Sequence, residues 1–235
     1  MKIPISPRLL ACAGFVPAGA QVADIGCDHG YLGIYLLSRP NGANRVIAAD
    51  VREGPLACAV KNAEKFGFTD KMSFHLSDGV QNIPRDFDHL VCAGMGADTI
   101  ISILSAAPWL QDARYHLILQ CQSKRQDLRR YLSEHGWRIK EESVLRDGRF
   151  LYTVMDVCYQ PGCQMLTPGQ WYFPPAMLEN PSRETMEYYH RTLRDLHLVI
   201  SARGEKAEPA LSAILAELEQ LPQNPDLSFL KEETP

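Results

Sequence analysis

Short apolar runs alternate with helical patterns from residue 21 to about residue 158. Three runs, at 45–49, 89–93 and 115–119, contain almost no polar residue. Such runs are typical of parallel strands that helices cover on both faces. The predicted strands are 21–25, 45–50, 72–76, 89–94, 115–120, 137–145 and 150–157, and the predicted helices between them are 31–37, 54–66, 97–106 and 124–135. The alternation predicts a doubly wound α/β sheet.

The last two predicted strands follow each other without a helix. The segment "LRDGRF" at 145–150 places an Asp-Gly pair between them, which is a strong hairpin signal. These two strands are therefore expected to be antiparallel. A mostly parallel sheet that ends in an antiparallel hairpin is the Rossmann-like sheet of class I methyltransferases, and this is the predicted fold class.

The pattern changes after Cys158. A segment rich in Pro and Gly precedes two helical patterns at 182–206 and 208–221, with Gly204 as the expected break between them. Two consecutive amphipathic helices predict a helical hairpin. The expected organisation is a methyltransferase domain with an N-terminal helix over 1–160, a C-terminal helical hairpin domain over 161–222 and a flexible tail over 223–235.

Composition narrows the class of protein only a little. The chain has 235 residues, 46% of them hydrophobic, which suffices for a substantial core. Its net charge of −4 at first argues against binding to nucleic acid. Residues 207–235 alone carry a net charge of −5, however, so the other residues together carry +1. The seven cysteines form no C-x-x-C pair, which indicates neither a zinc site nor a disulfide framework and favours a reducing cytoplasm. No apolar run approaches the roughly 18 residues of a membrane span, so no membrane association is expected.

The segment "VADIGCDHGYL" at 22–32 joins the first predicted strand to the first predicted helix. Such a turn lets a ligand approach the backbone, and the helix N-terminus presents free N–H groups. The spacing is not that of a G-x-G-x-x-G pyrophosphate loop, and the carboxylates of Asp24 and Asp28 would repel a pyrophosphate. They suit a cationic ligand instead. The predicted cofactor is S-adenosyl-L-methionine, which carries a sulfonium and an ammonium group and leaves S-adenosyl-L-homocysteine as product.

The next three predicted strands also end in acidic or small residues. Asp50 follows Gly26 by 24 residues, near the spacing of an acid that binds ribose hydroxyls. Asp78 would accept a hydrogen bond from the adenine amino group, and "AGMG" at 93–96 would leave room for a base. Singly, Asp50 is also a candidate helix N-cap, Asp78 with Gly79 a turn, and "AGMG" a sign of close packing. The predicted cofactor-binding residues are Arg8, Asp24, Gly26, Cys27, Asp28, Asp50, Val51, Asp78, Gly79, Ala93, Gly94 and Met95.

Several motifs resemble one methyltransferase family. "DIGCDHGYLGIYLL" is similar to the D-I-G-S-D-H-A-Y-L-P signature of bacterial TrmK-type enzymes, the tRNA (adenine-N1)-methyltransferases that act at position 22. "VCAGMGADTIISIL" and "LILQCQSKRQDLRRYLSEHGWRI" also resemble that family, and the resemblance covers about residues 6–158. The chain departs from the pattern at Cys27 for Ser, Gly30 for Ala, Gly33 for Pro and "LQCQ" for L-Q-P-N. The resemblance implies S-adenosylmethionine as cofactor and tRNA as partner.

Methylation of adenine N1 needs alignment more than a strong base, because N1 already has an in-plane lone pair. Asp28 is the candidate that stabilises the cationic ring, and it could equally hold the ammonium group of the cofactor. His29, the second catalytic candidate, would orient the methionine part or contact the substrate, or its side chain caps the helix. The candidate substrate-binding residues are Gly96, Gln120, Lys124, Arg125 and Arg129. Trp171, Tyr172 and Phe173 are candidates for stacking on a flipped base or for packing the helical hairpin.

The sequence predicts an S-adenosylmethionine-dependent tRNA (adenine-N1)-methyltransferase of the cytoplasm, without a metal ion, as a monomer or weak homodimer. Two alternatives stay open. A small-molecule methyltransferase is favoured because the chain outside residues 207–235 carries a net charge of only +1, which is weak for a protein that binds tRNA. A non-catalytic module that binds S-adenosylmethionine or tRNA is favoured by the departures at Ala97, Cys121 and Gln122.

Overall fold

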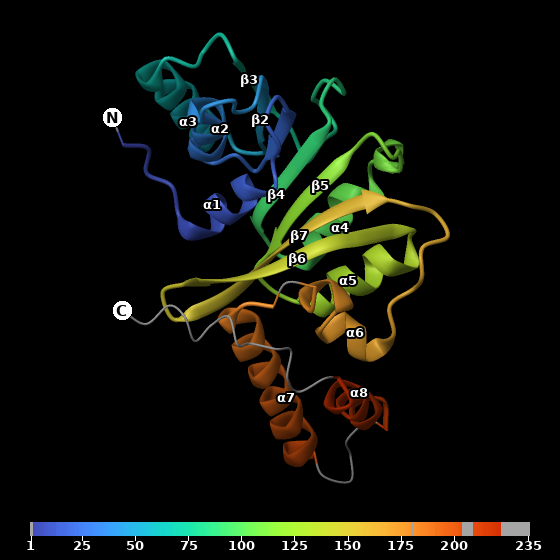
Figure 1. Ribbon diagram of the computed structural model, residues 1–235. Helices are drawn as coiled ribbons and strands as arrows, with labels where there is room; N and C mark the ends of the chain where they lie inside the picture. The colour runs from blue at the N-terminus through green and yellow to red at the C-terminus, as the bar shows by residue number, and fades with distance from the viewer. Residues whose placement is uncertain (1, 180, 204–208, 222–235) are drawn as a thin grey trace.

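The computed structural model describes residues 2–179, 181–203 and 209–221 (Figure 1). Its strands are β1 (Gln21–Ile25), β2 (Arg45–Asp50), β3 (Met72–Leu76), β4 (His89–Met95), β5 (His116–Cys121), β6 (Trp137–Asp147) and β7 (Phe150–Tyr159). Its helices are α1 (Pro7–Gly14), α2 (Tyr31–Ser38), α3 (Glu53–Phe66), α4 (Ala97–Ser105), α5 (Arg125–Glu134), α6 (Pro168–Tyr172), α7 (Arg183–Arg203) and α8 (Pro209–Glu219), with 3-10 turns η1 (Pro108–Leu110) and η2 (Pro175–Met177). The break expected at Gly204 and the tail expected over 223–235 lie outside the described residues.

The seven strands form one sheet in the order β3-β2-β1-β4-β5-β7-β6. Strands β1 to β5 pair in parallel, and β7 is antiparallel to both β5 and β6. The chain order reverses between β1 and β4, so the sheet is doubly wound about that point. The predicted fold class is confirmed, and the crevice beyond the carboxyl ends of β1 and β4 is the place where such sheets bind ligands.

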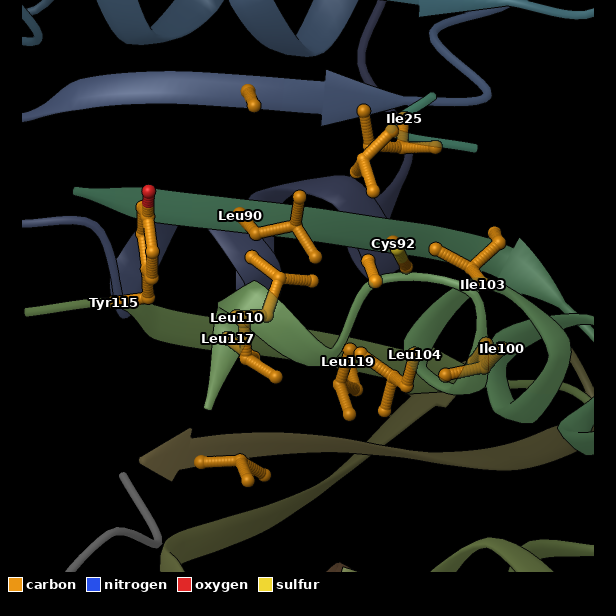
Figure 2. Close-up of a cluster of buried hydrophobic side chains, with 14 of the residues drawn as sticks. Ile25, Leu90, Cys92, Ile100, Ile103, Leu104, Leu110, Tyr115, Leu117 and Leu119 are labelled. Atoms are coloured by element: carbon orange, nitrogen blue, oxygen red, sulfur yellow. The ribbon is translucent and has the colours of Figure 1, made fainter. Parts of the chain in front are cut away.

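Alternate residues of the central strands point to opposite faces of the sheet and pack in two separate hydrophobic cores. Ile25, Leu90 and Leu117 belong to the core under α4, η1 and α5, part of which Figure 2 shows. Val22, Val46, Val91 and Ile118 belong to the core under α1, α2 and α3. Both faces of the sheet are therefore covered, which explains why the strand sequences are almost continuously apolar.

A third hydrophobic cluster joins the C-terminal helices to the far end of the sheet. Phe173, Tyr189 and Leu218 from α7, α8 and the segment after α6 pack with Val144 of β6 and Leu151 of β7. Ser182 directly precedes helix α7, and its hydroxyl accepts a 3.1 Å hydrogen bond from the Thr185 N–H in the first turn. The boundary expected at residue 160 stays a prediction, since the cluster draws on both sides of it.

Candidate cofactor-binding and active site

A cavity of about 470 Å³ opens at the carboxyl ends of β1, β2 and β4. Its walls are the loop after β1, the loop after β2, the end of β4 and the first turn of α1. The lining residues are Ser6, Arg8, Leu9, Asp24, Gly26, Cys27, Asp28, Leu32, Asp50, Val51, Arg52, Ala93, Gly94, Met95, Gln120 and Gln122. The volume is in the range of sites for small ligands and cofactors.

The loop after β1 is folded back over the end of β2. Gly26 and Cys27 both donate backbone hydrogen bonds to the Ala49 carbonyl, at 2.8 and 2.9 Å. Gly26 has φ +71°, and a Cβ there would lie 2.5 Å from Cε of Met95. Asp28 also has a left-handed φ, of 49°. The backbone conformation therefore favours glycine at residue 26, and any larger residue would also have to displace the end of the Met95 side chain.

The buried carboxylate of Asp24 lacks a hydrogen-bond partner on one oxygen. The residue is 3% exposed, and its Oδ2 contacts no donor among the described residues. Burial first, and the charge of Asp50 second, raise the pKa of Asp24 from 3.8 to about 7. A cationic ligand bound in the cavity would therefore favour the ionised form of Asp24.

Asp50 organises the adjoining loops. Its Oδ1 accepts the Arg52 N–H at 2.9 Å and its Oδ2 accepts the Asp28 N–H at 3.2 Å. The N-cap of α3 is Arg52, so the alternative role of Asp50 as the helix cap is not what the structure has. Asp50 is 4% exposed and lines the cavity. It stands where an acid could bind the hydroxyls of a ribose, and that role stays a prediction.

The end of β4 is held against β5 by a side-chain amide. Gln120 Oε1 accepts the Gly94 N–H at 3.0 Å, which leaves Gln120 Nε2 without a partner among the described residues. Gln120 and Asp24 both line this cavity, and an unpartnered amide donor and an unpartnered carboxylate oxygen in one cavity favour a ligand that supplies both a cation and a hydrogen-bond acceptor.

The two catalytic candidates occupy different positions. Asp28 lines the cavity with a side chain that is 60% exposed. His29 is not among the lining residues, and its Nε2 lies 3.7 Å from Oδ2 of Asp28. The N-cap of α2 is Gly30, so His29 does not cap that helix. Whether His29 orients the methionine part of a cofactor or contacts the substrate stays a prediction.

Ten of the predicted cofactor-binding residues line this cavity, and Asp78 and Gly79 do not. Asp78 is exposed and borders a separate space of about 20 Å³ with Ser102 and Ile103. A Cβ on Gly79 would meet Ile103 at 2.9 Å, so the glycine permits close packing against α4. Whether Asp78 contacts a bound cofactor stays a prediction.

Residues 5–155 match the family described as "Methyltransferase domain". The chain belongs to this family. The cavity at the switch point of the sheet is therefore the candidate active site of a methyltransferase domain.

Some relatives of this methyltransferase domain are named as tRNA methyltransferases. The tRNA (adenine(22)-N(1))-methyltransferase of Bacillus subtilis is 31% identical over 155 residues, which are 66% of this chain and 65% of that protein. A Streptococcus pneumoniae structure, "a putative tRNA (m1A22) methyltransferase, in complex with S-adenosyl-L-methionine", has a TM-score of 0.79 at 29% identity, over 92% of this chain and 99% of that one. The chain spans less than two thirds of the length of the first curated relatives.

The Bacillus subtilis TrmK crystal structure shares the fold. Its TM-score is 0.77 at 24% identity, over 93% of this chain and 95% of that chain. This share of the chain is larger than residues 5–155, so the fold similarity extends beyond the region that matches the family.

The predicted substrate-binding residues of the methyltransferase are divided between two places. Gln120 lines the cofactor cavity, and Gly96 follows β4 as the N-cap of α4. Lys124 and Arg125 border a second cavity of about 470 Å³ between α5 and the C-terminal helices. Lys124 Nζ lies 2.7 Å from Asp98 Oδ2 and is 55% exposed, and the Arg125 guanidinium lies 5.3 Å from the ring centre of Tyr188.

The prediction that Arg129 contacts substrate is wrong. Its side chain is fully buried and forms two hydrogen bonds with the Glu142 carboxylate, at 2.7 and 3.0 Å. The remaining N–H groups point to the carbonyls of Trp171 and Tyr172 and to the Tyr188 hydroxyl. No donor remains for a phosphate. Arg129 instead fastens α5 to β6, α6 and α7.

The cavity also contains residues that the sequence analysis missed. Ser6, Leu9, Leu32, Arg52 and Gln122 are lining residues. Ser6 precedes Pro7 and caps α1 through a 3.4 Å bond from the Leu9 N–H, and Ser-Pro is a recognisable helix start. Sequence could therefore locate α1, but its approach to the strand ends is a long-range contact that periodicity does not encode.

Other site types find no support among the described residues. No cluster of three or more His, Cys, Asp or Glu in residues 2–179, 181–203 and 209–221 could hold a metal ion. Within the same ranges, no helix combines the length and apolarity that a membrane span requires.

Proposed function

We propose that the protein transfers a methyl group from S-adenosylmethionine to N1 of an adenine in tRNA, at position 22. The observation that carries the proposal is the buried Asp24 carboxylate with an unpartnered oxygen, set beside Asp28 and Asp50 at the switch point of a methyltransferase-domain sheet. The descriptions of the Bacillus subtilis and Streptococcus pneumoniae proteins support tRNA adenine as the target.

The residues present fit this cofactor. Asp24 and Asp28 offer negative charge for its ammonium and sulfonium groups, and Asp50 offers a carboxylate for its ribose. Gly26 and Gly94 keep the loops after β1 and β4 free of side chains where a ligand must lie against the backbone. When bound, the cofactor supplies an electrophilic methyl group.

The chain itself needs to position the base rather than to remove a proton. Adenine N1 presents its lone pair in the ring plane, so proximity and alignment account for most of the rate gain. The amide of Gln120, with its free Nε2 donor, is placed to hydrogen-bond an acceptor of the base. Asp28 is the negative group that would stabilise the positive charge that develops on the methylated ring.

Lys124 and Arg125 are proposed to meet tRNA phosphates at the second cavity, since basic side chains dominate affinity for nucleic acid. We also infer a cytoplasmic location, because all seven cysteines are free thiols and three of them are partly exposed. A monomer or weak homodimer is the proposed assembly.

The test is to incubate the purified protein with methyl-labelled S-adenosylmethionine and bulk tRNA and to digest the product to nucleosides. Labelled 1-methyladenosine is the expected product, and it should disappear from a tRNA transcript in which adenine 22 is replaced by guanine. Label only in metabolite fractions would favour a small-molecule methyltransferase. Binding of S-adenosylhomocysteine without any transfer would favour a non-catalytic module. Asp50→Ala is the cofactor-site variant and should lose affinity for S-adenosylhomocysteine, while Arg114→Ala, at the opposite edge of the sheet, serves as control.

A further inference from the structure

The β6–β7 hairpin projects past the carboxyl end of β5 and lies between α1 and the first turns of α7 (Figure 1). Strand alternation gives its tip two faces. Val144 and Leu151 pack in the cluster with the C-terminal helices, and Arg146 pairs with Glu187 of α7. Leu145 packs in the core under α1, and Asp147 pairs with Arg8 of α1 at 3.1 Å. The hairpin therefore connects the cofactor cavity to the C-terminal helices.

The face toward α1 carries a row in which two aromatic rings lie between two arginines. The row is here called the hairpin patch: Arg149, Phe150, Tyr152 and Arg8. The Arg149 guanidinium lies 4.9 Å from the ring centre of Phe150. The rings of Phe150 and Tyr152 are 6.3 Å apart and edge to face. The Arg8 guanidinium lies 4.8 Å from the ring centre of Tyr152 and also lines the cofactor cavity. The hairpin patch thus runs from the hairpin turn to the wall of the active site.

Phe150 is the exposed aromatic residue of the row, and Arg149 beside it is exposed as well. Its side chain is 52% exposed, although an apolar residue in a sheet usually contacts the core. Arginines on both sides of an exposed and a partly exposed aromatic ring form a surface to which single-stranded nucleotides can bind, because bases stack on the rings and phosphates meet the guanidinium groups. Arg8 at the inner end of the row lines the cavity, so nucleotides next to a base held in the cavity would pass along the row.

We propose that the hairpin patch holds the tRNA strand beside the target adenine, with Phe150 stacking on a neighbouring base and Arg149 meeting its phosphate. This inference rests on the proposed function and adds to it the part of the chain that presents the substrate. Tyr152 and Arg8 continue the row inward, so that the base next in line would enter the cavity. Specificity for an unpaired segment follows, because stacking needs a base that has left its helix.

The test compares steady-state methylation of tRNA by Phe150→Leu, Phe150→Trp and Arg149→Gln proteins with that by the wild type. Phe150→Leu keeps an apolar side chain but removes the ring, and should raise the KM for tRNA about 10-fold, since a base stacked on an aromatic ring contributes enough for a change of that order. The kcat at saturating tRNA and the Kd for S-adenosylhomocysteine should stay unchanged. The Phe150→Trp protein keeps an aromatic ring, so its KM for tRNA should stay near that of the wild type. A merely structural role of Phe150 would not predict this difference between Leu and Trp.

Arg114→Ala is the matched control. Arg114 also stacks on an aromatic ring, that of Tyr115 at 4.4 Å, but it precedes β5 at the amino edge of the sheet. Its KM for tRNA should equal that of the wild type. A Phe150→Leu protein with an unchanged KM would overturn the inference and leave the proposed function intact, and so would a raised Kd for S-adenosylhomocysteine in place of a raised KM. A wild-type protein that methylates no tRNA would overturn both.

Discussion

Replacement of Asp24 by Asn should make the free protein more stable at neutral and alkaline pH. Asp24 is 3% exposed, and its pKa is raised to about 7 from 3.8 by burial and by Asp50. An acid whose pKa is higher in the folded than in the unfolded state binds its proton more tightly in the folded state. For Asp24 this stabilises the fold most below pH 3.8, where the carboxyl is protonated in both states. That contribution is lost as the pH rises from about 4 through about 7, and no further change follows above it.

The magnitude follows from the two pKa values. Their separation of about three pH units corresponds to about 4 kcal/mol of unfolding free energy, at 1.36 kcal/mol per unit. Asn keeps the shape of the side chain and does not titrate. The unfolding free energy of Asp24→Asn minus that of the wild type should therefore be small at pH 4 and rise by up to about 4 kcal/mol by pH 8.

Urea denaturation from pH 4 to pH 8, without cofactor, measures this difference directly. Other titrating groups are shared by the two proteins and cancel in the subtraction. Parallel stability profiles for wild type and Asp24→Asn would refute the reasoning, because they would mean that Asp24 titrates alike in both states. In the wild type, a cationic ligand should also release protons when it binds below pH 7, which calorimetry in buffers of different ionisation enthalpy detects; Asp24→Asn should release fewer.

Three further outcomes follow from the site and its supports. Arg129→Ala should lower the unfolding free energy measured by urea denaturation by about 3–5 kcal/mol, because it leaves the Glu142 carboxylate buried and unpaired. The control Arg130→Ala, on the exposed side of the same helix, should change stability little. Equal losses in the two variants would contradict the buried pair. Gly26→Ala should cost about 1–2 kcal/mol because of its φ of +71°, and should weaken binding of S-adenosylhomocysteine in calorimetry because Met95 must move within the cavity; unchanged affinity would contradict the close approach. Cys27 should react with iodoacetamide at pH 8 far more slowly than half-exposed Cys163, followed by mass spectrometry, because burial and then the charge of Asp24 raise the pKa of the Cys27 thiol; similar rates would contradict this.

The strands and helices of the methyltransferase domain could be predicted because local pattern and tertiary structure agree there. The predicted strand at 45–50 is β2 itself, and the predicted helix at 54–66 differs from α3 by one residue. Helices on both faces keep the strand sequences apolar, and the Asp-Gly turn at 147–148 marks the one antiparallel hairpin of the described sheet. The candidate cofactor residues were found for the same reason, since they follow strand ends that the pattern locates.

What sequence could not supply is the identity of partners across long distances. Arg129 has the spacing of an exposed basic helix face with Arg125, yet it shares a buried face with Leu128 and Leu132 because Glu142 lies opposite. The pairing depends on β6 and α5 meeting in space. In the same way, Arg8 was predicted as a cofactor-binding residue, but its contacts with Asp147 and Tyr152 come from a hairpin almost 140 residues later.

The cavity gathers conformational and electrostatic costs that a merely structural loop would not retain. Asp28 holds a left-handed φ, and Gln120 Nε2 and Asp24 Oδ2 stay without partners in the described residues. The other unpartnered buried groups are the neutral donors of Trp137, Thr153 and Trp171, so Asp24 contributes the one carboxylate among them. Departures of this kind are expected where function requires them, because mutation to Asn or to an apolar residue would readily relieve them. A ligand that brings a positive charge to Asp24 and an acceptor to Gln120 would remove the electrostatic part of that cost, which is the physical reason to place the cofactor there.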